Sequence, residues 1–400
     1  MRESLSAPLL PAGPGRRTIP TMNQIEIPAA FYRGGTSKGV FFHEHDLPAE
    51  REKRIGLFLQ VIGTPDPYGR QLNGMGGGIS SLSKVVSIGP ATRDDADVDY
   101  TFGQVMIDRP EIDFSTNCGN LSSAVGPFAI DEGLVSPDTA DGTAMVRLHN
   151  TNTGVVVHAH VPVAGGRAAV AGDFEIQGVH GTGACIQLDY LDPGGATTGS
   201  LLPAGEILST LEVPGEGSFE VTMTDAATGM VFIAAEDLGL GATEHPEAID
   251  ATPGLIDRLD RIRRAAGVAM GLANRPEDVT MTNPRIALLA PPTDYTAIDG
   301  THVAAADQDI TARMLSVRNI HRVAPLTSSL CLAAATKIEG SLPHRLARGN
   351  GGDLRVGTPS GVLPVGAEIA CEDGQWKALS ARSYRTARRL MQGSVLIPAP

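Results

Sequence analysis

Aromatic residues and long apolar runs are both scarce in this chain. Phe, Trp and Tyr make up 4% of its 400 residues, with one tryptophan. No apolar stretch approaches the ~18 residues that a membrane-spanning helix needs. Near the start, Arg16 and Arg17 are not followed by an apolar segment. We therefore expect residues 1–22 to form a flexible leader that is not an export signal.

Cysteine is also rare. Cys118, Cys185, Cys331 and Cys371 are widely spaced and contain no C-x-x-C pair. This spacing predicts neither a zinc site nor a disulfide framework. Reduced thiols are typical of a cytoplasmic protein, which is the location we expect.

Basic residues are outnumbered. The chain has 32 Lys and Arg against 45 Asp and Glu, a formal net charge of -13. A nucleic-acid-binding surface needs a clustered basic face to neutralise phosphates, so that class of function is excluded. An anionic substrate is not excluded, because a local pocket of donors can oppose the overall field.

Glycine and proline are abundant, with 47 and 28 residues. Together with 42% hydrophobic residues, this composition favours a globular protein with many short strands joined by tight turns. A chain of 400 residues exceeds one ordinary hydrophobic core. We expect an α+β protein, rich in strands, with two domains.

A weak internal repeat supports two related domains. Residues 33–47 and 224–238 each have the pattern of a strand, a glycine-containing turn and a second strand, and each ends in an acidic residue followed by leucine. The alignment matches Val40 with Val231, at an offset of 191. The strand beginning at Lys84 matches the strand at Arg285, at an offset of 201. This ordered growth of the offset indicates gene duplication with loop insertions.

The repeat continues into two Ala-rich helices. It pairs Cys118 with Thr327 at an offset of 209. We place one domain at 23–190 and the other at 191–384, with the boundary in the Gly/Pro-rich stretch that follows residue 190. A short helix over 386–391 and a strand over 394–397 are expected next, and this tail, about 385–400, can return to the first domain.

The strongest candidate for chemistry is the segment from Asn117 to Asn120, which places the Cys118 thiol and several backbone N–H groups at the start of a helix. Such a terminus favours a thiolate and binds carboxylates. The alternative is a buried structural cysteine. The matching terminus offers Thr327, Ser328 and Ser329, which suit a carboxylate seat.

A two-base racemase needs an acid–base group on each face of the reacting carbon, often two thiols. The second thiol is missing here, since Cys331 falls about one turn inside the second helix. We expect the other base to be Lys84, because desolvation on an apolar strand favours a neutral amine that can accept a proton. Preceding glycines would let the backbone approach a ligand, and Ser80 and Ser81 would donate hydrogen bonds. The alternative is a surface lysine whose stem covers apolar residues.

A third donor-rich loop contains Thr36, Ser37 and Lys38. Residues 35–39 match the G-x-S-x-G nucleophile elbow, and residues 81–84 match S-x-x-K. Both motifs require a helix after the serine, whereas the residues that follow read as strands, so neither hydrolase class is favoured.

Two histidine pairs could share strand faces: His43 with His45, and His158 with His160. No third ligand cluster accompanies either pair. We therefore expect no metal site.

These motifs together resemble the PrpF family of 2-methylaconitate isomerases, in order, over roughly residues 24 to 400. The combination is specific for the family. The matching segments are residues 33–39, 63–69, 74–77, 81–86, 117–127, 181–184, 191–195 and 359–361.

The resemblance implies two pseudo-symmetric domains of the diaminopimelate-epimerase type, each a sheet wrapped round a central helix, with the active site between them and no cofactor. It assigns Lys84 as the catalytic lysine and Cys118 as the active-site cysteine. The chain departs from the family at residues 327–329, Thr-Ser-Ser, where we expect Thr-Gly-Ala. Bulkier side chains at these positions would narrow the pocket that binds the substrate.

We accordingly expect an isomerase of the 2-methylcitrate route of propionate catabolism that shifts a proton on 2-methylaconitate. Aconitate, methylitaconate and 4-oxalomesaconate remain alternative substrates. The residues expected to bind the substrate carboxylates are Thr36, Ser37, Lys38, Ser80, Ser81, Asn117, Gly119, Asn120, Thr327, Ser328 and Ser329.

A second hypothesis is a non-catalytic accessory protein of an aconitase-like enzyme. A functional link to an aconitase-like dehydratase is compatible with both hypotheses. A homodimer is a further hypothesis, to be tested by measuring the oligomeric state.

Overall fold

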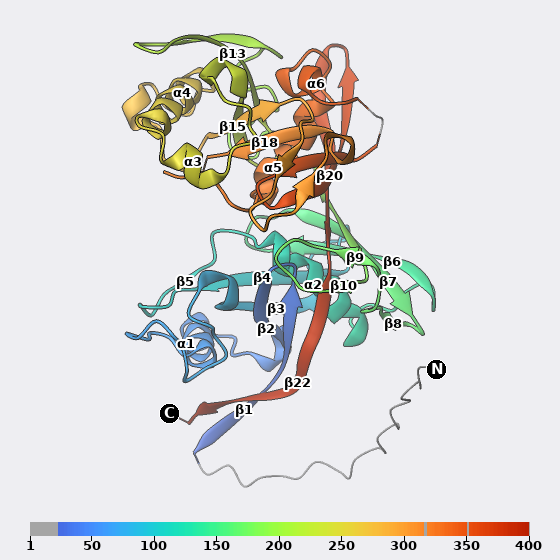
Figure 1. The fold of residues 1–400 in the computed structure, drawn as a ribbon. Coiled ribbons are helices and arrows are strands. Elements are labelled where there is room, and N and C mark those ends of the chain that lie inside the picture. Colours follow the sequence, from blue (N-terminus) through green and yellow to red (C-terminus); the bar gives the residue numbers. More distant parts are fainter. Residues whose placement is uncertain (1–22, 316–317, 350–351, 400) are drawn as a thin grey trace, which may run out of the picture.

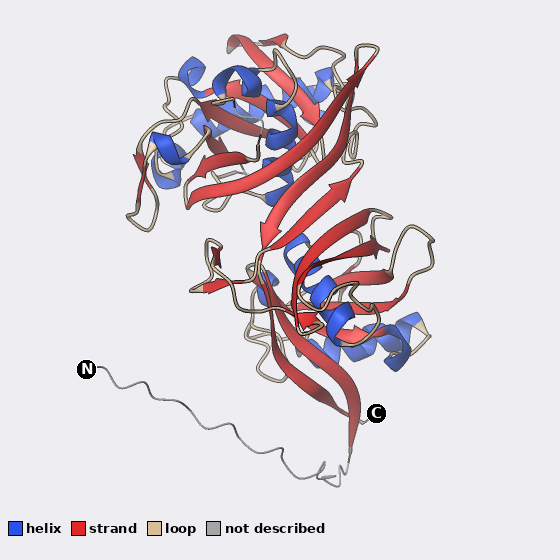
Figure 2. Ribbon diagram, turned by 90° about the vertical axis from the view of Figure 1, so that its right-hand side faces the viewer, coloured by secondary structure: helices blue, strands red, loops and turns tan. Residues whose placement is uncertain are grey.

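The computed structural model describes residues 23–315, 318–349 and 352–399 as two halves, one above the other in Figure 1. The leader expected over residues 1–22 lies outside the described residues. Strands dominate both halves, and helices lie among them (Figure 2). The predicted α+β class is confirmed.

Each half contains eight main strands. Those of the first half are β1 (Gln24–Gly34), β2 (Ser37–His43), β3 (Lys84–Pro90), β4 (Val98–Val105), β6 (Gly142–Asn150), β7 (Val156–Ala164), β11 (Ile186–Leu191) and β22 (Ala387–Pro398). Those of the second half are β12 (Ser209–Val213), β13 (Gly217–Asp225), β14 (Gly229–Ala234), β15 (Arg285–Ala290), β18 (Ile310–Met314), β19 (Leu354–Thr358), β20 (Gly361–Glu372) and β21 (Gln375–Arg385).

Shorter elements complete the description. The two-residue strands are β5 (Ile112–Asp113), β8 (Arg167–Ala168), β9 (Phe174–Glu175), β10 (Thr182–Gly183), β16 (Tyr295–Thr296) and β17 (His302–Val303). The α-helices are α1 (Arg51–Ile62), α2 (Gly119–Asp131), α3 (Pro246–Asp250), α4 (Leu255–Ala269), α5 (Leu326–Thr336) and α6 (Leu342–Leu346). The 3-10 helices are η1 (Glu44–Asp46), η2 (Ser80–Leu82), η3 (Ala235–Leu238), η4 (Pro276–Asp278) and η5 (Ala305–Asp307). Among the helices that the structure describes, none combines the length and apolarity needed to cross a bilayer.

The two halves have the same strand order. The first is β22-β1-β2-β3-β4-β6-β7-β11, and the second is β12-β13-β14-β15-β18-β19-β20-β21. Successive neighbours in both series run antiparallel, antiparallel, parallel, antiparallel, parallel, antiparallel and antiparallel. The internal repeat predicted from the sequence is therefore confirmed in the topology.

The chain crosses between the halves twice, at matching points. After β11 it enters the second half as β12, and after β21 it returns to the first half as β22, which pairs with β1 over almost its whole length (Figure 1). The helix predicted over residues 386–391 is wrong, because residues 387–391 belong to β22. Its local pattern resembles a helix, but the long antiparallel pairing with β1 overrides that propensity.

Each half encloses one helix. α2 lies inside the first half, where Leu121, Val125 and Phe128 are at most 1% exposed, and α5 lies inside the second half with Leu330 and Ala334 equally buried. Both helices are apolar on nearly all sides, as expected of a helix surrounded by protein. On the other sheet faces, α1 packs against the first half and α4 against the second.

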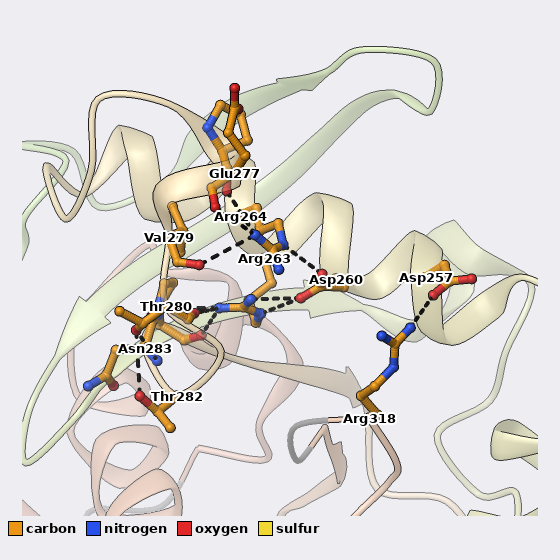
Figure 3. A network of polar contacts seen from close by, with 12 residues as sticks. Asp257, Asp260, Arg263, Arg264, Glu277, Val279, Thr280, Thr282, Asn283 and Arg318 are labelled. Atoms are coloured by element: carbon orange, nitrogen blue, oxygen red, sulfur yellow. Dashed lines mark hydrogen bonds and ion pairs between the residues drawn. The ribbon is translucent and has the colours of Figure 1, made fainter.

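Arg263 on α4 holds the segment that leads into β15 (Figure 3). Its guanidinium donates to the carboxylate of Asp260 at 2.7 Å and to the backbone carbonyls of Thr280 at 2.7 Å and Pro284 at 3.2 Å. The arginine residue is 3% exposed. Because Pro284 directly precedes Arg285, this network fixes where β15 and its first side chain begin.

The glycine-rich segment before Lys84 packs against protein. A Cβ atom on Gly74 would lie 2.3 Å from backbone atoms at the end of α1, and one on Gly76 would lie 2.3 Å from the side-chain oxygen of Gln71. Gln71 is buried, and its side-chain oxygen accepts a hydrogen bond from the Ser83 hydroxyl at 2.6 Å. The lack of a side chain at these glycines is therefore needed for contacts within the protein that anchor the start of β3, and their approach to a ligand stays a prediction.

The seam between the halves is the antiparallel pair β11–β21. Across it, Arg382 donates to Asp189 at 2.7 Å, and the same carboxylate contacts His160 at 3.0 Å and Gln187 at 2.9 Å. Burial alone would raise the pKa of Asp189, but hydrogen bonds from His160, Arg382 and Gln187 lower it to about 2. Asp189 therefore stabilises the folded protein when it is ionised.

We expect Asp189→Asn to lower the free energy of unfolding at pH 7 by about 2 kcal/mol, since a depressed carboxyl pKa stabilises the fold by about 1.4 kcal/mol per unit. This contribution is present above the unfolded pKa, roughly 4, and is lost as the pH falls toward 2. Urea unfolding at pH 7 and pH 3 measures it. The variant should differ less from the original chain at pH 3 than at pH 7, and an equal difference at both would contradict the assignment.

Candidate active site

The N-terminal ends of the two central helices meet between the halves. A Cβ atom on Gly119, the first residue of α2, would lie 2.6 Å from Cδ2 of Leu326, the first residue of α5. Helix N-termini present unpaired N–H groups and a partial positive charge. The fold therefore concentrates hydrogen-bond donors at this point.

The first helical turns correct the predicted alignment of the repeat. Ser122 donates from its backbone N–H to the Cys118 carbonyl at 2.9 Å, and Ser329 donates to the Pro325 carbonyl at 3.0 Å. Pro325, an offset of 207 from Cys118, is therefore its structural equivalent, and the predicted pairing with Thr327 is wrong. Runs of small polar residues align almost as well after a shift of two positions, so sequence alone did not set this register.

Cys118 is the N-cap of α2 and is partly buried. The side-chain oxygen of Asn117 accepts from the Cys118 N–H at 2.7 Å and from the Ser122 hydroxyl at 3.2 Å. The Ser122 hydroxyl also contacts the Tyr100 hydroxyl at 2.9 Å. This chain of hydrogen bonds orients the turn that carries the thiol and connects it to β4.

Lys84 begins β3 and is 7% exposed. Its ammonium donates to the side-chain oxygen of Gln104 at 2.6 Å and lies 4.9 Å from the centre of the Phe102 ring. Within residues 23–315, 318–349 and 352–399, no carboxylate pairs with it. A buried amine whose neighbours are a neutral amide and an aromatic ring has the surroundings expected of a general base.

Strand β4 connects the two predicted catalytic residues. Tyr100, Phe102 and Gln104 alternate along β4 and so face the same side of the sheet. Tyr100 reaches the turn of Cys118, and the other two contact Lys84. Successive residues on one face of a strand are about 7 Å apart. The structure thus places both residues on the α2 side of one strand, although no direct contact joins them among the described atoms.

Arg285 occupies the place of Lys84 in the second half. It is the first residue of β15, is half-buried, and donates to the Ser328 hydroxyl at 3.3 Å in the first turn of α5. Burial lowers the pKa of Arg285, and burial together with Arg285 lowers the pKa of His321 to about 4. His321 is therefore neutral at pH 7 and does not compete for an anion. The repeat already paired Arg285 with Lys84, yet the predicted site omitted it.

A cavity of about 220 Å³ lies between the halves. On its polar side, Asn120 donates from its side-chain amide to the Thr36 hydroxyl at 3.0 Å and accepts from the Arg385 guanidinium at 3.1 Å. The other lining residues are Phe174, Glu175, Ile176, Gln177, Val323, Ala324, Pro325, Leu326, Val362, Leu363, Pro364 and Tyr384. The cavity therefore combines one polar corner with a largely apolar wall.

Arg385 and Tyr190 were missed by the sequence-based prediction. Burial lowers the pKa of Arg385, and neighbouring Tyr190 and Cys118 partly oppose that shift. Burial also raises the pKa of Tyr190 to about 12. Neither residue belongs to a motif, and both lie on the strands β11 and β21 that join the halves, so no local signal indicates them.

The remaining predicted binding residues are spread around this centre. Ser37 is buried at the start of β2, and Lys38 lies 5.7 Å from the Phe31 ring centre. Ser80 and Ser81 lie on η2 beside Lys84, where the Ser80 carbonyl accepts from Gln104 at 3.0 Å. Of the predicted set, the cavity is lined by Thr36 and Asn120.

Residues 327–329, where the chain departs from the family pattern, do not narrow this cavity. Thr327 is exposed, Ser328 is buried against Arg285, and the Ser329 hydroxyl donates to the Pro325 carbonyl at 3.0 Å. The lining comes instead from Pro325 and Leu326. The expected narrowing was therefore wrong, because the side chains of Ser328 and Ser329 turn into the second half.

One histidine of each predicted pair contacts a carboxylate of the protein. His158 and His160 alternate with buried residues on β7 and face outward, where His160 contacts Asp189. His43 contacts Glu132 at 3.1 Å. In the part of the chain that the structure describes, no group of three or more His, Cys, Asp or Glu side chains is arranged to hold a metal ion.

Comparison with known proteins shows similarity over nearly the whole chain. A family model described as PrpF protein matches residues 24–398. The chain is 40% identical over 389 residues to the 2-methyl-aconitate isomerase of Shewanella oneidensis, covering 94% of this chain and 98% of that protein. It is 39% identical over 380 residues to the 4-oxalomesaconate tautomerase of Pseudomonas putida, covering 94% and 97%.

The fold is shared as well. The crystal structure of a methylitaconate-delta-isomerase matches with a TM-score of 0.87 and 36% identity, over 94% of this chain and 97% of that one. The expected architecture, two related halves that each wrap a sheet round a central helix, is confirmed.

Proposed function

The chain belongs to the PrpF family, and we propose from this premise that it is an isomerase that moves a proton on an unsaturated di- or tricarboxylic acid. The similar proteins are named for 2-methyl-aconitate, 4-oxalomesaconate and methylitaconate. Our first candidate substrate is 2-methylaconitate. We expect no cofactor, because proton transfer needs only an acid–base group and a stabilised carbanion.

The observation that carries this proposal is a set of cations without counter-ions. Arg285 and Arg385 flank the two helix tips, and neither has a carboxylate partner among the described residues, although the protein has 45 acidic residues. A partly buried charge without a counter-ion is costly. A polyanionic ligand between the halves would remove that cost.

We assign the proton transfer to Lys84. In its neutral form the amine would remove a proton from a carbon that is allylic to the double bond and adjacent to a carboxylate, giving a delocalised dienolate. Rotation about the weakened bond, or protonation at another carbon, would give the geometric or positional isomer. N–H groups at the tips of α2 and α5 would stabilise the negative charge as it develops, and Cys118 would deliver a proton or orient the substrate.

The apolar wall of the cavity supports a substrate with an alkyl group. Ile176, Leu326 and Leu363 line the cavity together with the polar residues Thr36 and Asn120. A methyl group would gain free energy there by leaving water, whereas the keto group of 4-oxalomesaconate, which is also a tricarboxylate, would lose hydrogen bonds. This favours methyl-bearing acids.

The test is deuterium exchange. We expect 2-methylaconitate incubated with the protein in heavy water to gain deuterium at the isomerised position as the isomer forms, which NMR can follow. Aconitate and methylitaconate serve as comparison substrates, and the fastest turnover identifies the preferred acid. Tight binding of these acids with neither exchange nor turnover would favour the non-catalytic accessory protein instead.

We also propose a cytoplasmic location, supported by four free cysteines. A homodimer and a functional link to an aconitase-like dehydratase remain proposals from the sequence. Light scattering of the purified chain would determine its oligomeric state.

A further inference from the structure

The Arg385 guanidinium has unused donors at the cavity. An arginine side chain has five N–H donors. Nε donates to the Asn120 side chain at 3.1 Å, and Nη1 donates to the Tyr384 carbonyl at 2.7 Å. Among the described residues, nothing accepts a hydrogen bond from Nη2, and Arg385 lines the cavity. The two acceptors that it does contact are neutral, so the positive charge is not compensated.

Tyr190 provides a second, independent unused donor. Its hydroxyl is buried beside the Ser383 hydroxyl, and neither has a partner other than each other, so at least one of their two O–H groups is unused. A Cβ atom on Gly119 would lie 3.0 Å from the Tyr190 oxygen, so this hydroxyl points at the first residue of α2. A buried hydroxyl without a partner costs free energy, which an incoming acceptor would recover.

These donors meet at the N-terminus of α2. Asn120 in its first turn contacts Arg385, and Gly119 adjoins the Tyr190 hydroxyl. Burial favours the neutral Tyr190 phenol, which is therefore a hydrogen-bond donor at pH 7. A guanidinium, a phenol and helix N–H groups around one point are complementary to a carboxylate.

We infer that Arg385 and Tyr190 form a carboxylate seat at the tip of α2, in addition to the seats near Lys84 and Arg285. This inference rests on the proposed function and narrows it. Three donor positions, namely the Arg385–Tyr190 seat, Arg285 and the Ser80 and Ser81 hydroxyls beside Lys84, correspond to three carboxylates. The preferred substrate is then a tricarboxylate, such as 2-methylaconitate, over a dicarboxylate such as methylitaconate.

The position of the seat also depends on both halves. Arg385 ends β21, a strand of the second half, but the helix it contacts belongs to the first half. Tyr190 lies on β11, the strand that pairs with β21. An anion bound here contacts residues from both sides of the seam.

The test uses two inert acids that differ by one carboxylate, tricarballylate and glutarate, titrated calorimetrically into the full chain. Arg385→Met keeps an unbranched apolar stem but removes the guanidinium group and its charge. We expect it to weaken tricarballylate binding by roughly 10- to 100-fold, the usual effect of losing a charge-assisted hydrogen bond. The affinity for glutarate, whose two carboxylates need only two of the three sites, should fall less than threefold. Tyr190→Phe should weaken tricarballylate binding by a smaller factor.

Two further variants separate charge from structure. Arg385→Lys restores the charge and should recover part of the affinity for tricarballylate. Arg388→Met removes an exposed arginine three residues away and should change neither affinity. Equal losses for both acids in Arg385→Met, or a lysine variant no better than the methionine variant, would show a structural role and overturn the seat.

The outcomes also distinguish this inference from the proposed function. If the original chain binds tricarballylate and Arg385→Met binds it as tightly, the Arg385 seat is wrong and the isomerase proposal stands. If the original chain binds neither acid, the polycarboxylate function is contradicted, and the seat with it. Thermal unfolding of each variant verifies that the fold is intact, and Arg385→Lys decides the question if the methionine variant does not fold.

Discussion

Replacing Lys84 by methionine is expected to lower the rate of isomerisation by roughly 10²- to 10⁴-fold, the usual contribution of a general base. Methionine has a similar length and keeps the contact with the Phe102 ring, but it cannot accept a proton. Deuterium incorporation into 2-methylaconitate should fall by the same factor. Because the amine also contacts Gln104, the unfolding temperature should be recorded alongside.

Lys53→Met is the matched control. Lys53 lies on α1, and its side chain is 67% exposed and paired with Glu50 at 2.7 Å. Surface ion pairs contribute little to stability, so this variant should keep its activity and fold. Near-normal turnover in folded Lys84→Met would exclude Lys84 as the base and would leave the mechanism without a proton acceptor.

Replacing Cys118 by alanine is expected to lower kcat/KM by roughly 10²-fold. Cys118 is the N-cap residue of α2, beside the helix N–H groups proposed to stabilise the developing charge, and it lies close enough to Arg385 and Tyr190 to influence the pKa of each. Cys371→Ala is the matched control, because Cys371 is exposed on β20, outside the residues that line the cavity. Unchanged kinetics in Cys118→Ala would remove this residue from the mechanism.

Cys118→Ser separates the two roles left open for the thiol. A serine hydroxyl can donate a hydrogen bond and orient a substrate, but it is a much weaker acid than a thiol. If Cys118 delivers a proton, the serine variant should lose kcat as severely as the alanine variant. If it orients the substrate, serine should restore most of kcat, and the remaining loss should appear in KM.

Local sequence patterns predicted most of the elements that carry these residues. Ser37–His43 and Lys84–Pro90 were expected as strands because β-branched and aromatic residues follow each serine-containing motif, and both are strands. This outcome also removes the basis for the two hydrolase motifs, which require helices there. The helix after Cys118 was expected from its run of small residues, and it begins at Gly119.

Local patterns failed where partners distant in the sequence decided the conformation. Residues 386–391 resemble a helix, but β1 supplies a complete antiparallel partner for them. The alignment of the helix tips was two positions out because several small polar residues fit either register. The close packing of the glycines before Lys84 was not predicted, because their neighbours, the end of α1 and Gln71, come together only in the folded chain.

The sequence by itself determined the family, the repeated architecture and the two residues proposed for catalysis, because these are encoded in contiguous motifs and in ordered offsets between them. The tertiary structure alone brought Arg385 and Tyr190, 195 positions apart, to the same helix tip through the pairing of β11 with β21. Such pairing depends on packing across the whole molecule and has no local signature. We propose that the charge of Arg385 distinguishes tricarboxylates from dicarboxylates. Its position at this helix tip could therefore be found only in the folded chain.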